Sequence, residues 1–353
     1  MSIAARATSP TPTPSVPPRD WSQNPAIVEL DIPGNVVVWA IGDTHGDYAR
    51  LIDLLVKGGI IDEVSRQPDQ LANVKWKAGN AVLVCTGDMI DKGAQSIEVL
   101  QLFMRLREIA PESGGQVIVT MGNHEAEFLA KPTKKNKEFV DELRLRNIGS
   151  SAVQTGTDSL GLGQFMRSLP FAARVNDWFF AHAGNTNSNN TNKATKRRSL
   201  EELRSFLQND VTTYGYGGKS LSEFDSLLEA RLENRWWEIP GEPSQLSNQR
   251  LRQYVTALGP RPDSVKHLVI GHKPGTVDFG VYGTREQGVM TAKWIDGLLF
   301  LIDCGMTSTV NYSTGALLRI RANDAYSIRF EGNVRKEEQL WYRPFTTSPS
   351  PTP

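Results

Sequence analysis

Short apolar runs alternate with amphipathic stretches along the first third of the chain. Residues 36–41, 81–86 and 116–121 are apolar runs typical of buried strands, and a glycine follows each of them. Residues 47–57 and 96–110 lie between these runs and carry apolar positions at helical spacing. This β-α-β-α-β order predicts an α/β protein in which helices cover a sheet.

The second half of the chain is richer in strand-like segments. Residues 171–175 and 178–182 flank an Asn-Asp pair, which is the pattern of a β-hairpin. We expect further strands at residues 267–270, 289–294, 298–302, 316–320 and 325–330. This half should therefore contribute mainly strands to the fold.

Two long stretches interrupt this pattern. Residues 131–165 and 185–265 are polar, and apolar positions at helical spacing occur in them only over short segments, at 138–145, 200–207 and 221–232. We expect both stretches to be insertions that lie over one edge of the sheet.

The two ends of the chain differ in composition from the middle. Residues 7–18 and 346–353 are rich in Ser, Thr and Pro, and they hold eight of the 20 prolines. Such tracts cannot bury apolar surface. We therefore expect tails at 1–26 and 344–353, and one folded domain over 27–343.

The overall composition excludes several classes of protein. Hydrophobic residues make up 39% of the chain and charged residues 22%, which is too apolar for a disordered protein. The 39 Lys and Arg residues balance the 39 Asp and Glu residues, so there is no general attraction to nucleic acid or to an anionic membrane. We expect no nucleic-acid partner.

The apolar runs and the cysteines exclude further classes of protein. No run approaches the roughly 20 residues that span a bilayer, and no signal-peptide pattern opens the chain. The two cysteines, Cys85 and Cys304, sit in apolar runs, which excludes a disulfide framework and a cysteine-rich metal site. We expect no membrane association and a cytoplasmic location.

Side chains that bind divalent metals follow five of the strand-like runs. They are Asp43 and His45 in GDTHG, Asp88 in GDMIDKG, Asn123 in GNHE, His182 in HAG and His272 in GHKPG. One histidine at a strand end is most often structural, but five strand ends with the same chemistry are hard to explain in that way. Ligands of open α/β sheets bind beyond the carboxyl ends of strands, and imidazole with carboxylate suits Mn, Fe or Zn. The sequence therefore predicts a metal site at this edge.

The motifs GDTHG, GDMIDKG, GNHE, HAG and GH, in this order, resemble those of the calcineurin-like metallophosphoesterase superfamily. The first three resemble more narrowly its phosphoprotein phosphatase branch. The long segments between the motifs are similar to the bacterial-type members, called Shewanella-like or Rhizobiales-like phosphatases. The resemblance covers about residues 35–305. It implies a four-layer αββα metallophosphoesterase sandwich with helical insertions near the active-site edge.

The resemblance also implies two divalent metal ions. The implied ligands are Asp43, His45, Asp88, Asn123, His182 and His272. Asp43 and His45 would hold the first ion, Asp88 would bridge both ions, and the other three would complete the second. We expect manganese, with iron or zinc as the alternatives. A hydroxide that bridges two such ions can attack phosphorus in line.

Catalytic roles follow from the same resemblance. His124, next to the implied ligand Asn123, resembles the family's general acid, which protonates the leaving oxygen. Asp91 resembles the carboxylate that orients this imidazole.

Phosphate binding is expected from three side chains. Lys92 stands where the phosphatase motif usually has arginine, and its point charge lacks the bidentate geometry of a guanidinium. Asn123 is the second candidate. Arg235, beside Trp236 and Trp237, is the third because it resembles the family's arginine next to aromatic residues, and Arg231 is the alternative to it.

These expectations favour a dimetal phosphomonoesterase that acts as a protein phosphatase of the serine/threonine or tyrosine type. Its partner would be a phosphorylated protein or peptide. One alternative is a nucleotide hydrolase similar to diadenosine tetraphosphatase. A second is a module that binds phosphoproteins with little turnover, although such a module has no need of the acid His124.

Overall fold

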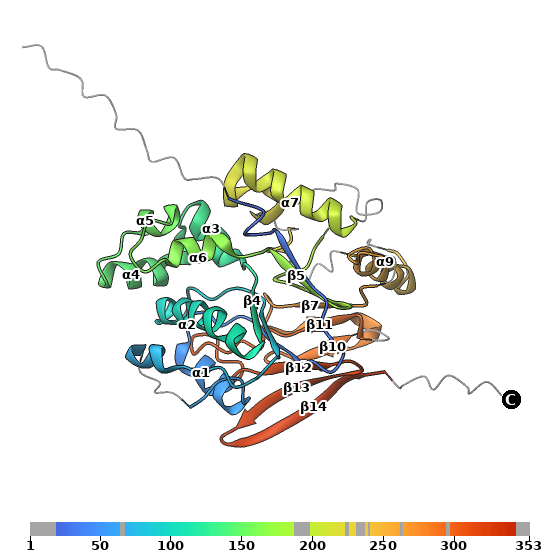
Figure 1. The fold of residues 1–353 in the computed structure, drawn as a ribbon. Helices are drawn as coiled ribbons and strands as arrows, with labels where there is room; N and C mark the ends of the chain where they lie inside the picture. The colour runs from blue at the N-terminus through green and yellow to red at the C-terminus, as the bar shows by residue number, and fades with distance from the viewer. Residues whose placement is uncertain are drawn as a thin grey trace, which may run out of the picture.

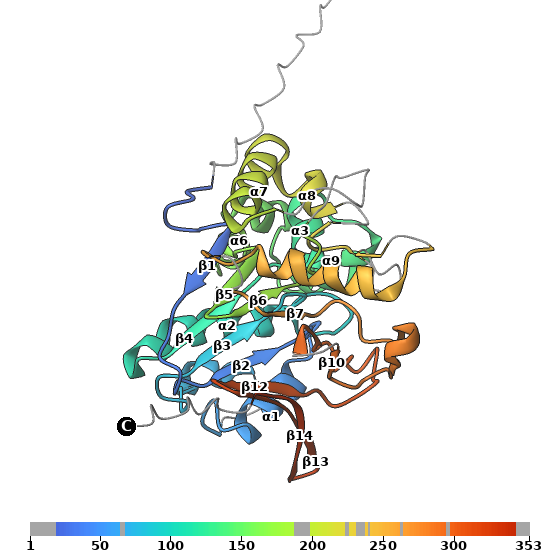
Figure 2. The ribbon, with the colours of Figure 1, turned by 90° about the vertical axis from the view of Figure 1, so that its right-hand side faces the viewer.

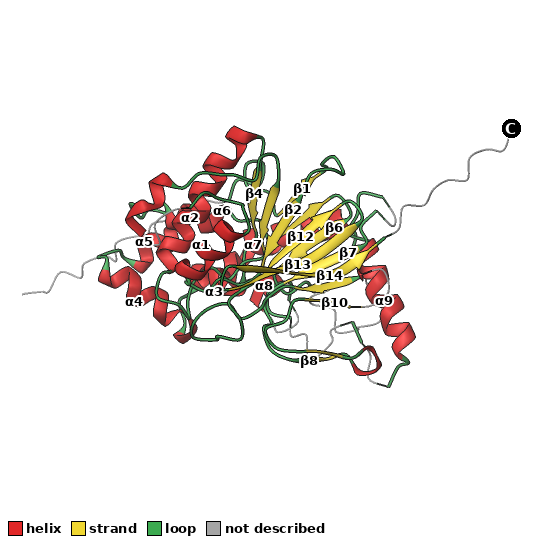
Figure 3. Cartoon of the chain, turned by 90° about the horizontal axis from the view of Figure 1, so that it is seen from below, coloured by secondary structure: helices red, strands yellow, loops and turns green. Residues whose placement is uncertain are grey.

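Two six-stranded sheets form the centre of the molecule, and helices lie outside them (Figure 1). The computed structural model describes residues 19–63, 68–186, 198–222, 226–230, 237–238, 241–261, 264–293 and 297–343. Figure 3 shows the strands gathered between α1, α2, α4 and α5 on one side and α9 on the other. The expected α/β sandwich is confirmed.

The first sheet contains the three strands predicted from the first third of the chain. Its order is β14 (Val334–Tyr342), β13 (Asp324–Glu331), β12 (Leu317–Arg321), β2 (Val38–Ile41), β3 (Val82–Cys85) and β4 (Gln116–Val119). Strands β2, β3 and β4 are parallel. Helices α1 (Tyr48–Lys57) and α2 (Ser96–Ile109) connect them, so the β-α-β-α-β prediction is correct.

The second sheet comes mostly from later segments. Its order is β1 (Ile27–Leu30), β5 (Ala172–Val175), β6 (Trp178–Ala181), β7 (His267–Ile270), β11 (Leu299–Leu301) and β10 (Thr291–Lys293). Strands β5 and β6 form the predicted hairpin. Strand β7 runs parallel to both β6 and β11, so the carboxyl ends of these three strands lie at one edge. A separate ribbon pairs β8 (Val277–Asp278) with β9 (Thr284–Arg285).

Alternation along the strands explains the layers. In β2, Val38 and Ala40 belong to the apolar cluster between the two sheets, whereas Trp39 and Ile41 belong to the cluster that includes the helices. Phe180 of β6 faces the inner cluster in the same way. Successive side chains of a strand point to opposite faces, so strands that are apolar at every position must be covered on both sides.

The two insertions supply the remaining helices. The first gives α4 (Lys137–Leu145), α5 (Ser150–Thr155) and α6 (Leu162–Ser168), which follow α3 (Asn123–Ala130). The second gives α7 (Leu200–Tyr214), α8 (Lys219–Ser222) and α9 (Ser244–Thr256). Figure 2 shows α7 and α9 on the side of β5, β6 and β7, away from α1. Short 3-10 helices occur at Pro68–Asn73, Ala110–Ser113, Lys134–Asn136, Gly215–Gly217 and Gly280–Tyr282.

Some segments differ from the prediction. Of the helix expected over 221–232, residues 221 and 222 lie in α8, and residues 226–230 form a turn whose Leu227 and Leu228 are buried. Residues 223–225 and 231–232 of this prediction lie outside the described residues. Strands β1 and β14 were not predicted. Strand β14 lies at the edge of its sheet and exposes six of its first seven positions to solvent, so no apolar alternation marks it.

The described chain packs against the body from Arg19 onward. The Arg19 guanidinium donates hydrogen bonds of 2.9 to 3.3 Å to the backbone carbonyls of Asn24, Pro25, Arg167 and Ser168. It also lies over an aromatic ring, 4.7 Å from the centroid of Trp21. Residues 19–26, assigned above to a tail by composition, therefore contact the folded domain.

Among the helices of the described residues, none combines the length and the apolar character that a membrane span requires.

One buried histidine makes folding stability sensitive to acid. His267 stacks on Trp178 at 4.0 Å and lies edge-on to Trp341, and its Nδ1 lies 2.8 Å from the Gly297 carbonyl. Its Nε2 is buried and has no hydrogen-bond partner among the described residues. Burial therefore lowers the pKa of His267 to about 4.

We expect the free energy of unfolding to fall as the pH drops from about 6.5 to about 4. In this range His267 binds a proton in the unfolded chain but stays neutral in the folded protein. The difference between the two pKa values is worth about 3 kcal/mol. His267→Asn places its amide nitrogen at the position of Nδ1, so it can still donate to the Gly297 carbonyl but cannot titrate. Urea unfolding across this pH range should show a shallower loss of stability in the variant than in the wild type, and equal slopes would contradict this assignment.

Candidate active site

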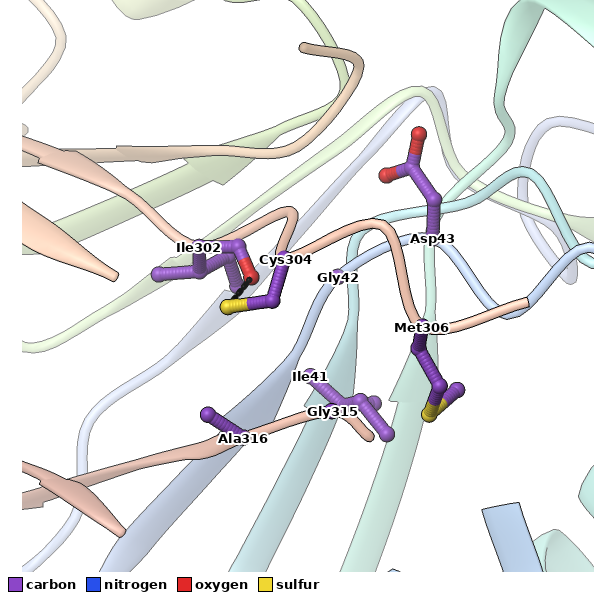
Figure 4. Close-up of a pocket in the computed structure, with 8 residues that line it drawn as sticks. All are labelled: Ile41, Gly42, Asp43, Ile302, Cys304, Met306, Gly315 and Ala316. Atoms are coloured by element: carbon purple, nitrogen blue, oxygen red, sulfur yellow. Dashed lines mark hydrogen bonds between the residues drawn. The ribbon is translucent and has the colours of Figure 1, made fainter. Parts of the chain in front are cut away.

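Six of the residues predicted as metal ligands lie together where strands of both sheets end. Asp43 and His45 follow β2, Asp88 follows β3, Asn123 begins α3 after β4, His182 follows β6 and His272 follows β7. All six are nearly inaccessible to solvent except His272, which is half-buried. Figure 4 shows the Asp43 carboxylate beyond the end of the strand that leads through Ile41 and Gly42.

The carboxylate of Asp88 lies at the centre of this group. Its Oδ2 is 3.3 Å from Nε2 of His182 and 3.5 Å from Nε2 of His45. The same oxygen is 4.0 Å from Nε2 of His124. Asp88 therefore contacts donor atoms on two sides, which is the position that a bridging carboxylate requires.

Three more donor atoms converge on one side of Asp88. Nε2 of His182 lies 3.0 Å from Nδ1 of His272 and 2.9 Å from Oδ1 of Asn123. Oδ1 of Asn123 lies 3.2 Å from Nδ1 of His272. Two imidazole nitrogens and one carboxamide oxygen at such distances bring lone pairs toward a common point.

Backbone carbonyls orient two of the imidazoles. Nδ1 of His45 lies 3.0 Å from the carbonyl of Ile90, and Nδ1 of His182 lies 2.9 Å from the carbonyl of Thr86. In the neutral imidazole, a proton on each Nδ1 satisfies these bonds and leaves Nε2 as an acceptor. This is the arrangement by which proteins fix the tautomer of a metal-binding histidine.

The electrostatics of the site favour positive charge. Burial opposes a charged His182, but Asp88 and Asp43 outweigh it and raise the pKa of His182 to about 10. Burial lowers the pKa of His272 to about 3. The facing histidines hold the pKa of Asp88 well below its ordinary value, although burial acts in the opposite direction. Buried carboxylates that attract a proton onto a neighbouring imidazole would also attract a cation.

The donor set therefore fits divalent metal ions. The ligand atoms form two groups of three, and within each group all three atoms lie within 4.8 Å of one another. Asp88 belongs to both groups. The second group, with His182 and His272, consists of residues predicted for the second ion. The first group contains His45 together with His124, where the sequence predicted Asp43.

Asp43 and His124 differ in how they are held. The Asp43 carboxylate accepts the backbone N–H of His272 at 3.0 and 3.1 Å and lies 3.8 Å from Nε2 of His45. His124 uses Nδ1 for a hydrogen bond of 2.8 Å to Oδ2 of Asp91. This leaves its Nε2 directed toward Asp88 and toward the candidate metal site.

The predicted pair of His124 and Asp91 is thus in contact. Burial opposes the charged imidazole, but Asp88 and the hydrogen bond to Asp91 outweigh it, so the pKa of His124 lies above its ordinary value. A raised pKa increases the fraction of this imidazole that carries a proton. That is the state a general acid needs.

Lys92 lies beside the same centre. Its Nζ is 2.7 Å from Nε2 of His45, and its side chain is half-buried. The position places a positive charge next to the candidate ligands. Arg235 and Arg231 lie outside the described residues. The turn at 226–230 precedes both in the chain, and the Leu227 carbonyl there accepts the N–H groups of Ala183 and Gly184, each at 3.0 Å.

Glu125 is a residue of the candidate site that the sequence argument missed. Its carboxylate is fully buried and accepts four backbone N–H groups, those of Gly122, Asp88, Met89 and Ile90, at 2.7 to 3.2 Å. Burial raises the pKa of Glu125 to about 7, while the N–H groups act against this rise. Its place in the GNHE motif was the available signal.

These hydrogen bonds hold a strained loop. Asp88, Asp91 and Lys92 have φ values of 51°, 66° and 58°, a left-handed region that side chains with a Cβ rarely adopt. Such strain persists only where surrounding contacts determine the backbone. Glu125 supplies those contacts at the start of the loop.

Arg285, also missed, ties two other loops together. It is fully buried, and its guanidinium donates to the carbonyls of Lys273, Gly275 and Val289 at 2.5 to 2.8 Å and to that of Asp303. The segment after His272 is thereby fixed to the segment after β11.

Burial, with the nearby charge of Asp303 adding to it, raises the pKa of Asp43 well above its ordinary value.

A small cavity of about 10 Å³ lies below Asp43 (Figure 4). This is about the space of one water molecule. Cys304 lines it and donates a weak hydrogen bond of 3.5 Å to the carbonyl of Ile302, and burial raises the pKa of its thiol to about 12. The cavity is too small for a substrate, and Cys304 is a core residue rather than a nucleophile.

The chain belongs to the calcineurin-like phosphoesterase family, whose pattern matches residues 36–286. This confirms the family expected from the motifs.

Individual relatives cover most of the chain. An uncharacterized protein of Schizosaccharomyces pombe is 28% identical, over 85% of this chain and 82% of its own length. Shewanella-like protein phosphatase 1 of Plasmodium berghei is 24% identical, over 80% and 70%. A symmetrical bis(5'-nucleosyl)-tetraphosphatase of Xanthomonas oryzae pv. oryzae is 25% identical, over 71% and 65%.

A solved structure shares the fold. The cold-active protein-tyrosine phosphatase of a psychrophilic Shewanella species superimposes with a TM-score of 0.63, over 90% of this chain and 82% of that chain, at 22% identity.

The hydrogen bonds of Glu125 generate a stability prediction. In Glu125→Gln, an amide NH₂ replaces one oxygen and leaves two buried N–H groups unpaired, at a cost of roughly 1–3 kcal/mol each. We expect the free energy of unfolding to fall by at least about 2 kcal/mol, with weaker Mn²⁺ binding by calorimetry. Glu112→Gln, at an exposed position, is the matched control and should change neither quantity. Equal behaviour of the two variants would contradict the role of Glu125.

Proposed function

We propose that this calcineurin-like phosphoesterase is a metal-dependent phosphomonoesterase whose substrates are phosphorylated proteins. The observation that carries the proposal is the hydrogen bond between His124 and Asp91 beside the group of candidate metal ligands. A phosphate monoester with a serine or threonine leaving group needs a proton on that oxygen. His124 is the side chain able to deliver it.

The candidate ligands fit two divalent ions, for which we propose Mn²⁺, with iron or zinc as the alternatives. Asp43, His45 and Asp88 would hold one ion. Asp88, Asn123, His182 and His272 would hold the other. When bound, such ions supply Lewis acidity, which lowers the pKa of water and neutralises phosphate charge.

The protein's own residues perform the other tasks. Lys92 and Asn123 contact phosphate oxygens, and the positive charge of Lys92 stabilises the charge that develops on them. Arg235, or Arg231 in its place, is proposed to add a second cationic contact. Water attacks phosphorus, the bond to the leaving oxygen breaks, and that oxygen takes the proton from Nε2 of His124. The products are an alcohol and inorganic phosphate.

Asp91 prepares this proton transfer. By accepting the hydrogen bond from Nδ1, it keeps Nε2 pointed into the site and stabilises the protonated imidazole. Both effects raise the fraction of His124 that is ready to act.

Similarity supports the substrate class and also its main competitor. The Plasmodium relative is named as a protein phosphatase, and the Xanthomonas relative is named as a nucleotide hydrolase. The pair of His124 and Asp91 favours the monoester, because an alkoxide leaving group needs an acid more than a phosphate leaving group does.

We propose that the protein acts in the cytoplasm.

A matched substrate panel tests the proposal. The Mn²⁺-loaded protein should release phosphate from phosphoserine, phosphothreonine or phosphotyrosine peptides faster than from diadenosine tetraphosphate or a phosphodiester. Preference for the dinucleotide or the diester would overturn the substrate class. Peptide binding without release would leave only a binding module.

His124→Gln tests the mechanism within the same panel. We expect kcat on a phosphoserine peptide to fall by about 10²–10⁴, with inhibition by inorganic phosphate retained, because general-acid catalysis contributes on that scale. His267→Gln, which changes a histidine of the core, is the matched control and should keep near-normal kcat. Unchanged turnover in His124→Gln would remove its assigned role.

A further inference from the structure

The first insertion reaches into the centre of the site through Asn136. This residue ends the 3-10 helix Lys134–Asn136 just before α4, and its side chain is fully buried. Its Nδ2 donates to Oδ2 of Asp91 at 2.8 Å and to the backbone carbonyl of His124 at 3.3 Å. One amide group therefore contacts both members of the proposed acid pair.

The orientation of this amide is fixed by its other end. Oδ1 of Asn136 accepts the backbone N–H of Thr133 at 3.0 Å. An N–H group can only be met by the oxygen of the amide, so the nitrogen must face Asp91. The turn and the carboxylate thus hold the side chain in one arrangement.

Asp91 receives two further hydrogen bonds. Its Oδ2 accepts Nδ1 of His124, and its Oδ1 accepts the backbone N–H of Phe139, at 3.2 Å, from the first turn of α4. A carboxylate that is 0% exposed needs such donors, because burying an unpaired charge is costly. Without Asn136, the oxygen that faces His124 would lose the donor that opposes its rotation.

We propose that Asn136 is a positioning residue for catalysis: it holds Asp91 and the backbone of His124 so that Nε2 of His124 faces the leaving oxygen. The inference rests on the proposed function, in which His124 is the general acid. It assigns a catalytic task to the insertion at 131–165, which the sequence indicated only as a cover over the sheet edge.

A separate contact holds α4 in place. Glu142 accepts the backbone N–H groups of Ser96 and Ile97, at 2.8 and 2.9 Å, where α2 begins. Phe139 and Leu143 of the same helix are buried in the core. Loss of the Asn136 side chain should therefore leave α4 docked, so its effect can be measured in a folded protein.

The leaving group separates positioning from a general structural role. A phosphoserine peptide releases an alkoxide that needs a proton, whereas 4-nitrophenyl phosphate releases a phenolate that leaves without one. A change that affects only the general acid lowers kcat on the phosphoserine peptide and leaves kcat on 4-nitrophenyl phosphate unchanged. A change that affects the metal ligands or phosphate binding lowers kcat on both substrates.

The experiment compares Asn136→Ala with the wild type on these two substrates, as Mn²⁺-loaded protein. We expect kcat on the phosphoserine peptide to fall about tenfold or more, with KM nearly unchanged, and kcat on 4-nitrophenyl phosphate to stay within about twofold, because a misplaced acid loses much of its contribution. Thr133→Ala is the matched control. It removes the hydroxyl that caps the same turn, through Lys135, but leaves the contacts to Asp91.

Two further variants keep the test decisive. Asn136→Ser keeps a polar group in the turn and loses the reach to Asp91, so it should show the same selective loss even if Asn136→Ala fails to fold. Asp91→Asn combined with Asn136→Ala should be no slower than Asp91→Asn alone, because both changes act through one pair.

The outcomes distinguish this inference from the proposed function. An equal loss on both substrates, or no loss, in a folded Asn136 variant overturns the positioning role while His124→Gln still shows selective loss. If His124→Gln shows no selective loss of kcat on the phosphoserine peptide, or the wild type does not hydrolyse phosphopeptides, the proposed function fails. This inference then fails with it.

Discussion

The buried carboxylate of Glu125 accepts four backbone N–H groups, and much of the site depends on this one interaction. It joins the loop after β4 to the loop after β3, where Asp88 lies in a left-handed conformation. Ile90, whose N–H it receives, offers its carbonyl to Nδ1 of His45 and so sets the direction of that imidazole. A single acidic group thus fixes both a central carboxylate and one of the histidines around it.

The sequence predicts the central strands well because they are buried on both faces and therefore read as continuous apolar runs. Strand β7 has the bounds that its pattern predicted. Strand β14 lacks such a signal because it is an exposed edge, rich in charge, whose partner β13 determines its conformation. Residues 226–230 carry apolar residues at helical spacing, but tertiary hydrogen bonds with the loop after His182 hold them as a turn.

The sequence also predicts which candidate site residues come together, where this depends on residue type and on position at a strand end. Strand ends bring the predicted ligands together, and His124 meets Asp91 as expected. Asn136 was not identified because its partner Asp91 is distant in sequence, which no local pattern reveals. Glu125 lies in the GNHE motif, but the motif does not show that its carboxylate binds backbone N–H groups of the loop after β3. The insertion at 131–165 illustrates the difference: its composition indicates a polar cover, yet its contacts reach the centre of the site.

We propose that Asp88 joins two cation sites while His124 stays free of metal and bonded to Asp91. The most direct measurement is anomalous diffraction above the manganese edge, from crystals of the protein grown with Mn²⁺. We predict two peaks, both in contact with Asp88, one beside Asp43 and His45 and the other beside His182 and His272, with the hydrogen bond between His124 and Asp91 intact. A single peak, no peak, or a peak bound by His124 with that hydrogen bond broken would contradict the account.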